Sequence, residues 1–182
     1  MLDIARLYLS HGLCVIPCHA PLPGGGCSCE NPACPSAGKH PSLVSWRDYQ
    51  KRLPTEAEIT SWFARPGLNV GCLTGAVSGI VVLDIDPRHG GDESLRDLVA
   101  KGLPPTVTVL TGGGGQHLYF KHPGGVVRNA TGIMPGIDVR GDGGFVVMPP
   151  SLHASGRCYE WETVYSLLES KLTEMPAWGI EL

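Results

Sequence analysis

The sequence predicts an α+β protein built on a mixed or antiparallel sheet. Three observations lead to this prediction. Helix patterns alternate with strand patterns over the first hundred residues, and hairpin patterns dominate afterwards. The 25 glycines and 16 prolines among 182 residues predict many turns and short strands. A hydrophobic content of 42% is enough for one core, and the length suits a single domain spanning residues 1–182.

The first half of the chain contains three helix patterns and three strand patterns. Apolar spacing predicts helices over residues 2–10, 54–63 and 92–101. The second of these starts with a capping box, in which Thr55 and Glu58 satisfy backbone donors reciprocally. Short apolar runs predict strands over residues 13–17, 69–75 and 79–86.

The second half is predicted to consist mainly of hairpins. One hairpin pairs residues 106–111 with 116–121 around the four glycines at 112–115. A second is expected to pair residues 136–141 with 144–150. A late strand over 158–162 and a helix near 163–172 complete the expected elements.

Composition excludes several classes of protein. A formal net charge of −3 excludes a strongly basic nucleic-acid binder, so any contact with nucleic acid must be local. The sequence contains no run of about 18 apolar residues, so we expect no transmembrane helix. Residues 1–20 lack the basic start of a signal peptide, so we expect a cytoplasmic protein. Seven cysteines, an odd number with three clustered, indicate a metal site in a reducing compartment rather than a disulfide framework.

The clustered cysteines lie in a loop at about residues 19–45 that is rich in proline and glycine. Its ligand pattern is C-x-C-x4-C-x5-H, formed by Cys27, Cys29, Cys34 and His40. Three thiolates and one imidazole make a closed tetrahedral set for one structural Zn²⁺. Metal binding would replace the hydrophobic core that so long a loop lacks. Cys18 or His19 can substitute for one ligand, and the alternative is a set of reduced cysteines without metal.

Two aspartates end the apolar stretch "VVLDID". Asp84 and Asp86 stand at i and i+2, so a continuing strand would place both on one face, about 6–7 Å apart. Two carboxylates so close repel each other unless a cation lies between them. Mg²⁺ and Mn²⁺ prefer oxygen ligands of this kind. The alternative is that these acids pair with Arg88 or cap the following helix.

Two further segments supply polar residues to the expected strands. Asp138 and Arg140 share a face of "GIDVRG", where Asp138 would add a third carboxylate and Arg140 a fork for phosphate oxygens. His117 follows the four glycines, which allow a ligand close to the backbone. The alternatives are an Asp138–Arg140 pair on the surface and a solvent-facing histidine at a hairpin end.

These segments, in this order, resemble the bifunctional primase-polymerase family of prokaryotic plasmids, phages and other mobile elements, within the archaeo-eukaryotic primase superfamily. "VVLDID" matches its acidic motif, "GQH" at 115–117 its small-x-His motif, and "GID" at 136–138 its third motif. The cysteine loop ending in "GKHP" is similar to a zinc-stem. The resemblance covers roughly residues 1–165.

The resemblance implies a fold and a set of roles. The implied fold is an RRM-like sheet unit joined to an α/β unit, with the zinc loop inserted and the site between the units. Asp84, Asp86 and Asp138 would hold two catalytic Mg²⁺ or Mn²⁺ ions, and His117 and Arg140 would contact the triphosphate. Thr111 and Ser151 are placed to bind phosphate or base, with Lys39 and Arg128 as weaker candidates for phosphate contacts.

The implied function is template-directed joining of nucleotides, as a DNA primase and DNA polymerase acting on single-stranded template, primer and (d)NTPs. A catalytically silent nucleotide-binding or nucleic-acid-binding module and a metal-dependent nuclease are the alternatives. The sequence shows no Walker-type motif. We therefore expect either a stand-alone protein or a catalytic domain served by a helicase partner or a further C-terminal domain.

Overall fold

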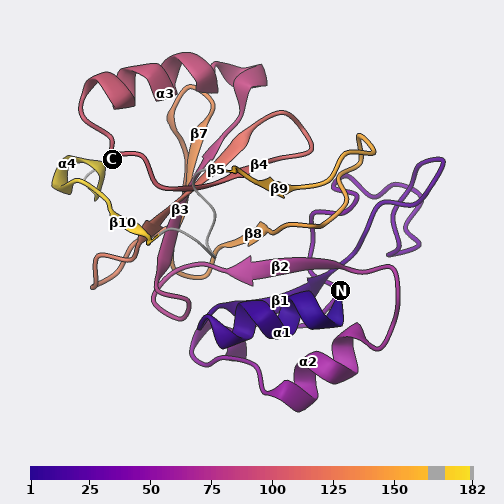
Figure 1. The fold of residues 1–182 in the computed structure, drawn as a ribbon. Coiled ribbons are helices and arrows are strands. Elements are labelled where there is room, and N and C mark those ends of the chain that lie inside the picture. The colour runs from indigo at the N-terminus through magenta and orange to yellow at the C-terminus, as the bar shows by residue number, and fades with distance from the viewer. Residues whose placement is uncertain (164–170, 181–182) are drawn as a thin grey trace.

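Two antiparallel sheets lie side by side in the computed structural model, which describes residues 1–163 and 171–180 (Figure 1). One sheet has three strands and the other has seven. Helices flank both sheets, so the predicted α+β class is confirmed. A single pair of strands, at the end of the described chain, runs parallel.

The smaller sheet has the strand order β1–β2–β8. It consists of β1 (Cys14–Cys18), β2 (Asn69–Leu73) and β8 (Phe145–Val147). Helices α1 (Leu2–Ser10) and α2 (Glu56–Phe63) pack beside it, as Figure 1 shows. Their buried side chains form one core with residues from both sheets, which joins the two sheets through apolar contacts.

The larger sheet has the order β6–β7–β3–β5–β4–β9, with β10 added in parallel to β5. Its strands are β3 (Ile80–Ile85), β4 (Val107–Leu110), β5 (Gln116–Lys121), β6 (Ala130–Met134), β7 (Ile137–Arg140), β9 (Glu160–Trp161) and β10 (Thr173–Glu174). Helix α3 (Gly91–Ala100) covers one face through a second apolar core. The remaining elements are η1 (Asp48–Gln50), η2 (Pro87–His89) and α4 (Ala177–Ile180).

The expected hairpin between residues 136–141 and 144–150 is wrong. β7 pairs with β6 and β3 in the larger sheet, whereas β8 pairs with β2 in the smaller one. The chain crosses between sheets at Gly144, where an added Cβ would lie 2.8 Å from the Thr74 hydroxyl. One of the two partners of β7 is β6, a strand that the sequence did not predict. Residues 164–170 of the expected last helix lie outside the described residues.

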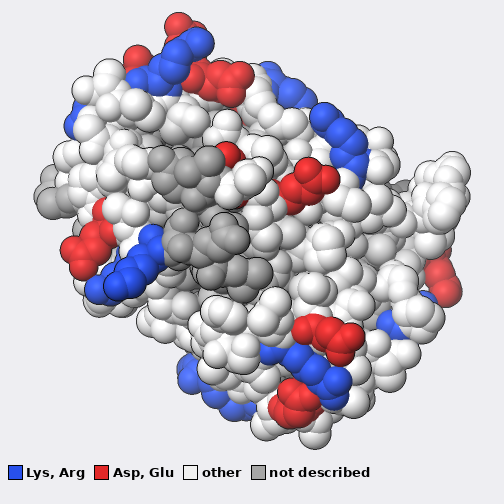
Figure 2. Space-filling model, viewed as in Figure 1, with Lys and Arg blue, Asp and Glu red and all other residues white. Residues whose placement is uncertain are grey.

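Charged side chains are spread thinly over the face drawn in Figure 2. Lys and Arg residues are scattered there, several of them beside Asp or Glu, and they form no continuous basic patch on that face. This distribution agrees with the low net charge of −3.

The predicted capping box at the start of α2 is confirmed. The Thr55 hydroxyl accepts a hydrogen bond from the Glu58 backbone, and the Thr55 backbone donates to Glu58 Oε2. Arg52 donates two hydrogen bonds to the same carboxylate, and the Tyr49 hydroxyl donates a third. Arg52 is the main reason that the pKa of Glu58 lies well below its ordinary value, with the Thr55 backbone and Tyr49 contributing.

A depressed pKa makes the contribution of Glu58 dependent on pH. The stabilisation is present above the unfolded-state pKa of about 4.3 and is lost as pH falls towards the folded-state pKa. We expect Glu58→Gln to cost about 1 kcal/mol at pH 7, as measured by urea unfolding. This difference from wild type should shrink steadily below about pH 4. Glu93→Gln, on the exposed first turn of α3, is the control.

Candidate active site

Three of the predicted residues stand in one row across the larger sheet. Asp84 on β3 lies directly opposite His117 on β5 and directly opposite Asp138 on β7. Directly paired residues of neighbouring strands point to the same face. The alternating residues Leu83 and Ile85 pack on the other face, in the core beneath α3. The pleat therefore turns an acidic row away from that core.

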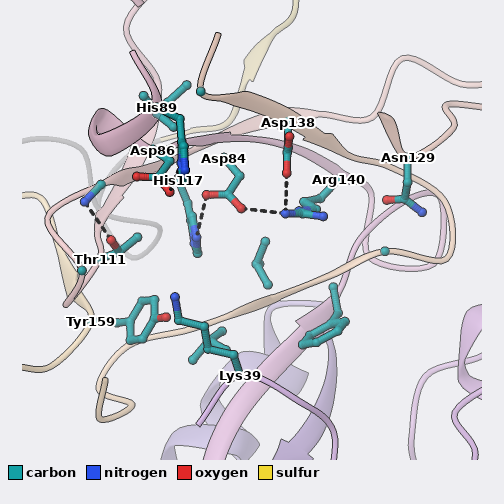
Figure 3. Close-up of a pocket in the computed structure, with 18 of the residues that line it drawn as sticks. Lys39, Asp84, Asp86, His89, Thr111, His117, Asn129, Asp138, Arg140 and Tyr159 are labelled. Atoms are coloured by element: carbon teal, nitrogen blue, oxygen red, sulfur yellow. Dashed lines mark hydrogen bonds and ion pairs between the residues drawn. The ribbon is translucent and has the colours of Figure 1, made fainter. Parts of the chain in front are cut away.

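The row faces a cavity of about 810 Å³ between the two sheets. One wall carries Asp84, Asp138 and their neighbours. Figure 3 shows Lys39 and Tyr159 on the opposite side of the space, with the Lys39 side chain extending towards the acids. Strand β8 of the smaller sheet also lines the cavity. The site thus combines residues that are far apart in the sequence.

Arg140 links the two carboxylates of the row. Its Nη2 donates to Asp84 Oδ2 at 2.9 Å and to Asp138 Oδ2 at 2.8 Å. Each of the three side chains is about 30% exposed, so all remain accessible from the cavity. The second oxygen of Asp138 accepts a hydrogen bond from the Gly132 backbone. One guanidinium therefore offsets the repulsion between two carboxylates.

Asp86 does not continue the strand, contrary to the expectation that both acids share a strand face. β3 ends at Ile85, and Asp86 caps the short helix η2. Its carboxylate accepts two hydrogen bonds from the Arg88 side chain and lies 3.0 Å from His89 Nδ1. Arg88 is the main reason that the pKa of Asp86 is well below its ordinary value. The pairing with Arg88, one of the alternatives, is therefore present, although Asp86 also lines the cavity.

His117 is buried rather than facing solvent at a hairpin end. Its Nε2 lies 3.6 Å from Asp84 Oδ1, and its Nδ1 is buried without a hydrogen-bond partner. Burial lowers the pKa of His117, with Arg140 and Lys39 adding to this effect and Asp84 opposing it. The lowered pKa favours the neutral imidazole, which carries one N–H donor.

Steric crowding explains why position 115 is a glycine. An added Cβ there would meet the Ile85 carbonyl oxygen of the neighbouring strand and the Thr111 hydroxyl at 3.4 Å. Only a residue without a side chain lets β5 approach β3 so closely. The small residue two places before His117 thus lets the glycine turn lie against the end of β3.

The other predicted contact residues divide into two groups. Thr111 lines the cavity, and its hydroxyl accepts a hydrogen bond from the Gly115 backbone. Ser151 is fully buried and lies outside the residues that line the cavity. Its hydroxyl accepts a hydrogen bond from the Val70 amide and donates one to the Val70 carbonyl oxygen. This position corrects the expected role in nucleotide binding. Arg128 is exposed and is likewise outside the cavity lining.

Tyr159 is a cavity residue that sequence reasoning missed. Its ring is 5.9 Å from His117 and 6.0 Å from His153, and burial raises the pKa of its hydroxyl. In the sequence it appears only as an aromatic residue of a short late strand. No sequence motif includes Tyr159, because only the tertiary fold brings it beside His117, which is far away in the sequence.

The zinc ligands predicted from the sequence come together. Among residues 1–163 and 171–180, only Cys27, Cys29, Cys34 and His40 form a group of at least three potential ligands within 4.8 Å of one another. His40 Nε2 lies 3.5 Å from Cys27 Sγ and 3.4 Å from Cys34 Sγ. Cys18 is a core residue of β1, and His19 stacks on His40 with ring centres 4.7 Å apart. Neither alternative ligand joins the group.

The chemistry of this group suits a thiophilic metal ion. Burial raises the pKa of the Cys27 thiol, but hydrogen bonds from the backbone of Cys29 and Gly38 outweigh it and lower the pKa to about 6. Cys27 is thus mostly thiolate at pH 7, the form that binds zinc. Four donors of this type fit one tetrahedral Zn²⁺. The three aspartates of the cavity are more widely spaced than this group.

Loss of one cysteine should remove the metal. We expect Cys29→Ser to reduce bound zinc from one per chain to none, measured by release to a chromophoric chelator. The loop at residues 19–45 should also become more sensitive to limited proteolysis. Cys158→Ser is the matched control because Cys158 is free and exposed. Full zinc retention by Cys29→Ser would contradict the assignment of Cys29 as a ligand.

Comparison with known protein families decides the relationship suggested by the motifs. The family described as "Bifunctional DNA primase/polymerase, N-terminal" matches residues 5–178. The chain belongs to this family. A search of curated proteins found no match to the sequence. Membership of this primase/polymerase family confirms the resemblance and points to an enzyme that handles nucleotides and DNA.

None of the helices in the described part of the chain is long and apolar enough to span a bilayer.

Proposed function

We propose that this chain is a template-directed nucleotidyltransferase that extends or starts DNA primers. The observation that carries the proposal is the row of Asp84, His117 and Asp138 on one cavity wall, in a chain of the primase/polymerase family. The three residues match three separate motifs, and strand pairing brings them together in space. A chance set of motifs would not converge on one cavity.

The cavity carboxylates suit hard divalent cations. Asp84, Asp86 and Asp138 offer only oxygen donors, all of them line the cavity, and Asp84 and Asp138 remain about 30% exposed. Such donors favour Mg²⁺ or Mn²⁺ over zinc. Two such ions, when bound, lower the pKa of a primer 3′-hydroxyl and stabilise the leaving pyrophosphate. We assign these three aspartates as the ligands.

The remaining cavity residues would position the nucleotide. His117 holds a proton on a buried ring beside Asp84 and can donate it to a phosphate oxygen. Arg140 offers a planar fork for phosphate once cations share the carboxylates. Thr111 stands on the glycine turn at the edge of the same cavity. These roles follow from chemistry and position in the cavity.

The strand order supports a primase-type core. β3 and β4 are parallel to each other and lie on either side of β5, and α3 connects them in the sequence. β7 lies on the other side of β3. This is the split βαβ arrangement of RRM-like sheets. The smaller sheet with α1 and α2 would be the second unit. We propose that both units, over residues 1–182, act as one catalytic domain.

The low positive charge of the chain suggests that another protein or domain helps it to bind DNA. The net charge is −3, and binding to a phosphate backbone depends on local cations. We therefore propose that template and primer are bound with a helicase partner or a further domain. A cytoplasmic setting fits the zinc-ligand thiols, which need a reducing compartment.

Incorporation of labelled nucleotide by the zinc-loaded protein on a single-stranded template tests the proposal. The assay is run with and without a primer, with Mg²⁺ or Mn²⁺, and with dNTPs or NTPs. Incorporation on the primer identifies a polymerase, and products without primer identify a primase. No incorporation in any lane by the folded protein would refute the proposal.

A silent binding module is the second candidate, and one observation favours it. Asp86 is held by Arg88 and His89, and the three aspartates are not gathered as a ligand group in this structure. Such a module would bind nucleotide without incorporating it. Arg88→Ala separates the two functions, because it frees Asp86 and should raise incorporation at low Mg²⁺ only in an active enzyme.

A further inference from the structure

The zinc loop reaches into the cavity through one residue. Lys39 directly precedes the zinc ligand His40, and it lines the same cavity as Asp84 and His117. In Figure 3 its side chain extends from the wall opposite those residues. A loop built around one metal site thus contributes a cation to the other site.

The backbone on both sides of Lys39 is fixed. The Gly38 carbonyl accepts a hydrogen bond from Asn69 Nδ2 at 3.1 Å, and a Cβ on Gly38 would lie 2.6 Å from Pro21. On the other side, the His40 carbonyl accepts from the His19 backbone, and its ring lies within 3.5 Å of Cys27 Sγ and Cys34 Sγ. Lys39 therefore projects from a restrained segment.

Within the described residues, no carboxylate lies at ion-pair distance from the ammonium group of Lys39. Lys39 lines the cavity together with Asp84 and Asp138, from the opposite wall. A cation held opposite a row of metal-binding acids suits a ligand that carries several negative charges, and a polyphosphate is such a ligand.

We propose that Lys39 binds a phosphate group of the nucleotide and that zinc binding by Cys27, Cys29, Cys34 and His40 holds Lys39 in place for this contact. The inference rests on the proposed function, since it concerns the same cavity. It gives the zinc loop a role in ligand binding beyond the stability of the loop.

The geometry explains why the two sites are coupled. The Cα atoms of Lys39 and His40 are separated by one peptide unit, about 3.8 Å, so a metal bond at His40 restrains the adjacent lysine closely. Removing zinc frees the His40 ring from the cysteines. The pairing of residues 40–42 with β1 remains, so the loss is expected to be partial.

Binding of inorganic tripolyphosphate and of dATP, measured by calorimetry at fixed Mg²⁺, tests the inference. We expect Lys39→Met to weaken both affinities roughly tenfold or more, because one charge-assisted contact is lost. Lys39→Arg should stay within about threefold of wild type. Lys101→Met, at the exposed end of α3, is the charge-matched control. Zinc content and thermal unfolding show whether each variant is folded.

The second part of the experiment tests the role of zinc, with the same two probes and two proteins that lack the metal. Protein stripped with a zinc-selective chelator and desalted, and the Cys29→Ser variant, should each bind about threefold or more weakly than the zinc-loaded chain. Adding zinc back should restore the stripped protein and leave Cys29→Ser unchanged. Unchanged affinity after zinc loss would overturn the coupling between zinc and Lys39. Unchanged affinity in Lys39→Met would overturn the phosphate contact, and so would a wild-type protein that binds neither probe.

The incorporation assay separates this inference from the proposed function. Normal incorporation together with binding that does not depend on Lys39 would overturn the inference alone. Binding that depends on Lys39 and on zinc, in a wild-type chain that incorporates nothing, would refute the polymerase and support the inference.

Discussion

Asp84→Asn should abolish nucleotide incorporation while leaving the fold intact. Asp84 is the centre of the row, paired across the sheet with both His117 and Asp138. An amide of the same shape removes the charge that would hold a metal ion, and metal stabilisation of a transition state is worth several kcal/mol. We expect incorporation to fall roughly a thousandfold, measured as single-turnover rates at saturating Mg²⁺.

Two controls make the Asp84 result specific. Asp97→Asn changes the same charge on the exposed face of α3 and should incorporate at the wild-type rate. Thermal unfolding of Asp84→Asn should remain close to wild type, because Arg140 keeps its hydrogen bond to Asp138. Incorporation at the wild-type rate by Asp84→Asn would refute the assignment of this acid.

Arg140→Met should separate metal binding from nucleotide binding. Arg140 donates to both Asp84 and Asp138, so it occupies the position between two acids that a cation would share. Without it the carboxylates repel each other and attract Mg²⁺ more strongly. The Mg²⁺ concentration for half-maximal incorporation should therefore fall. At the same time the nucleotide KM should rise roughly tenfold or more, because a charge-assisted phosphate contact is lost.

The opposite signs of these two changes are the useful feature of the experiment. A general loss of structure would weaken metal and nucleotide binding together. Arg96→Met, on the exposed surface of α3, is the control for the removal of one arginine. If Arg140→Met left both the Mg²⁺ midpoint and the nucleotide KM unchanged, Arg140 would be a surface partner of the acids only.

The sequence was informative where a short pattern fixes the geometry. The metal ligands of the loop are four residues close in sequence, and their spacing alone predicted a group that the fold does bring together. The capping box of α2 was equally local. The α+β class followed from the order of the helix and strand patterns.

The errors arose where pairing partners are distant. Residues 145–147 look like the second arm of a hairpin, yet they join β2, more than seventy residues earlier. β6 was missed because "ATGIM" contains a glycine and has no fully buried residue, so it shows no alternating pattern. Asp86 was placed on a strand because periodicity does not show that Pro87 ends it. Ser151 was assigned by residue type, whereas burial gives its hydroxyl to Val70.

The cavity lies between two sheets, and its walls belong to different ones. A ligand that contacts the acids on one wall and Lys39 on the other would tie the larger sheet to the zinc loop, which pairs with β1 of the smaller sheet. Binding to the folded state alone raises the melting temperature in proportion to the logarithm of ligand concentration. Heating the protein with a panel of nucleotides and divalent salts would therefore rank its ligands without any assay of turnover.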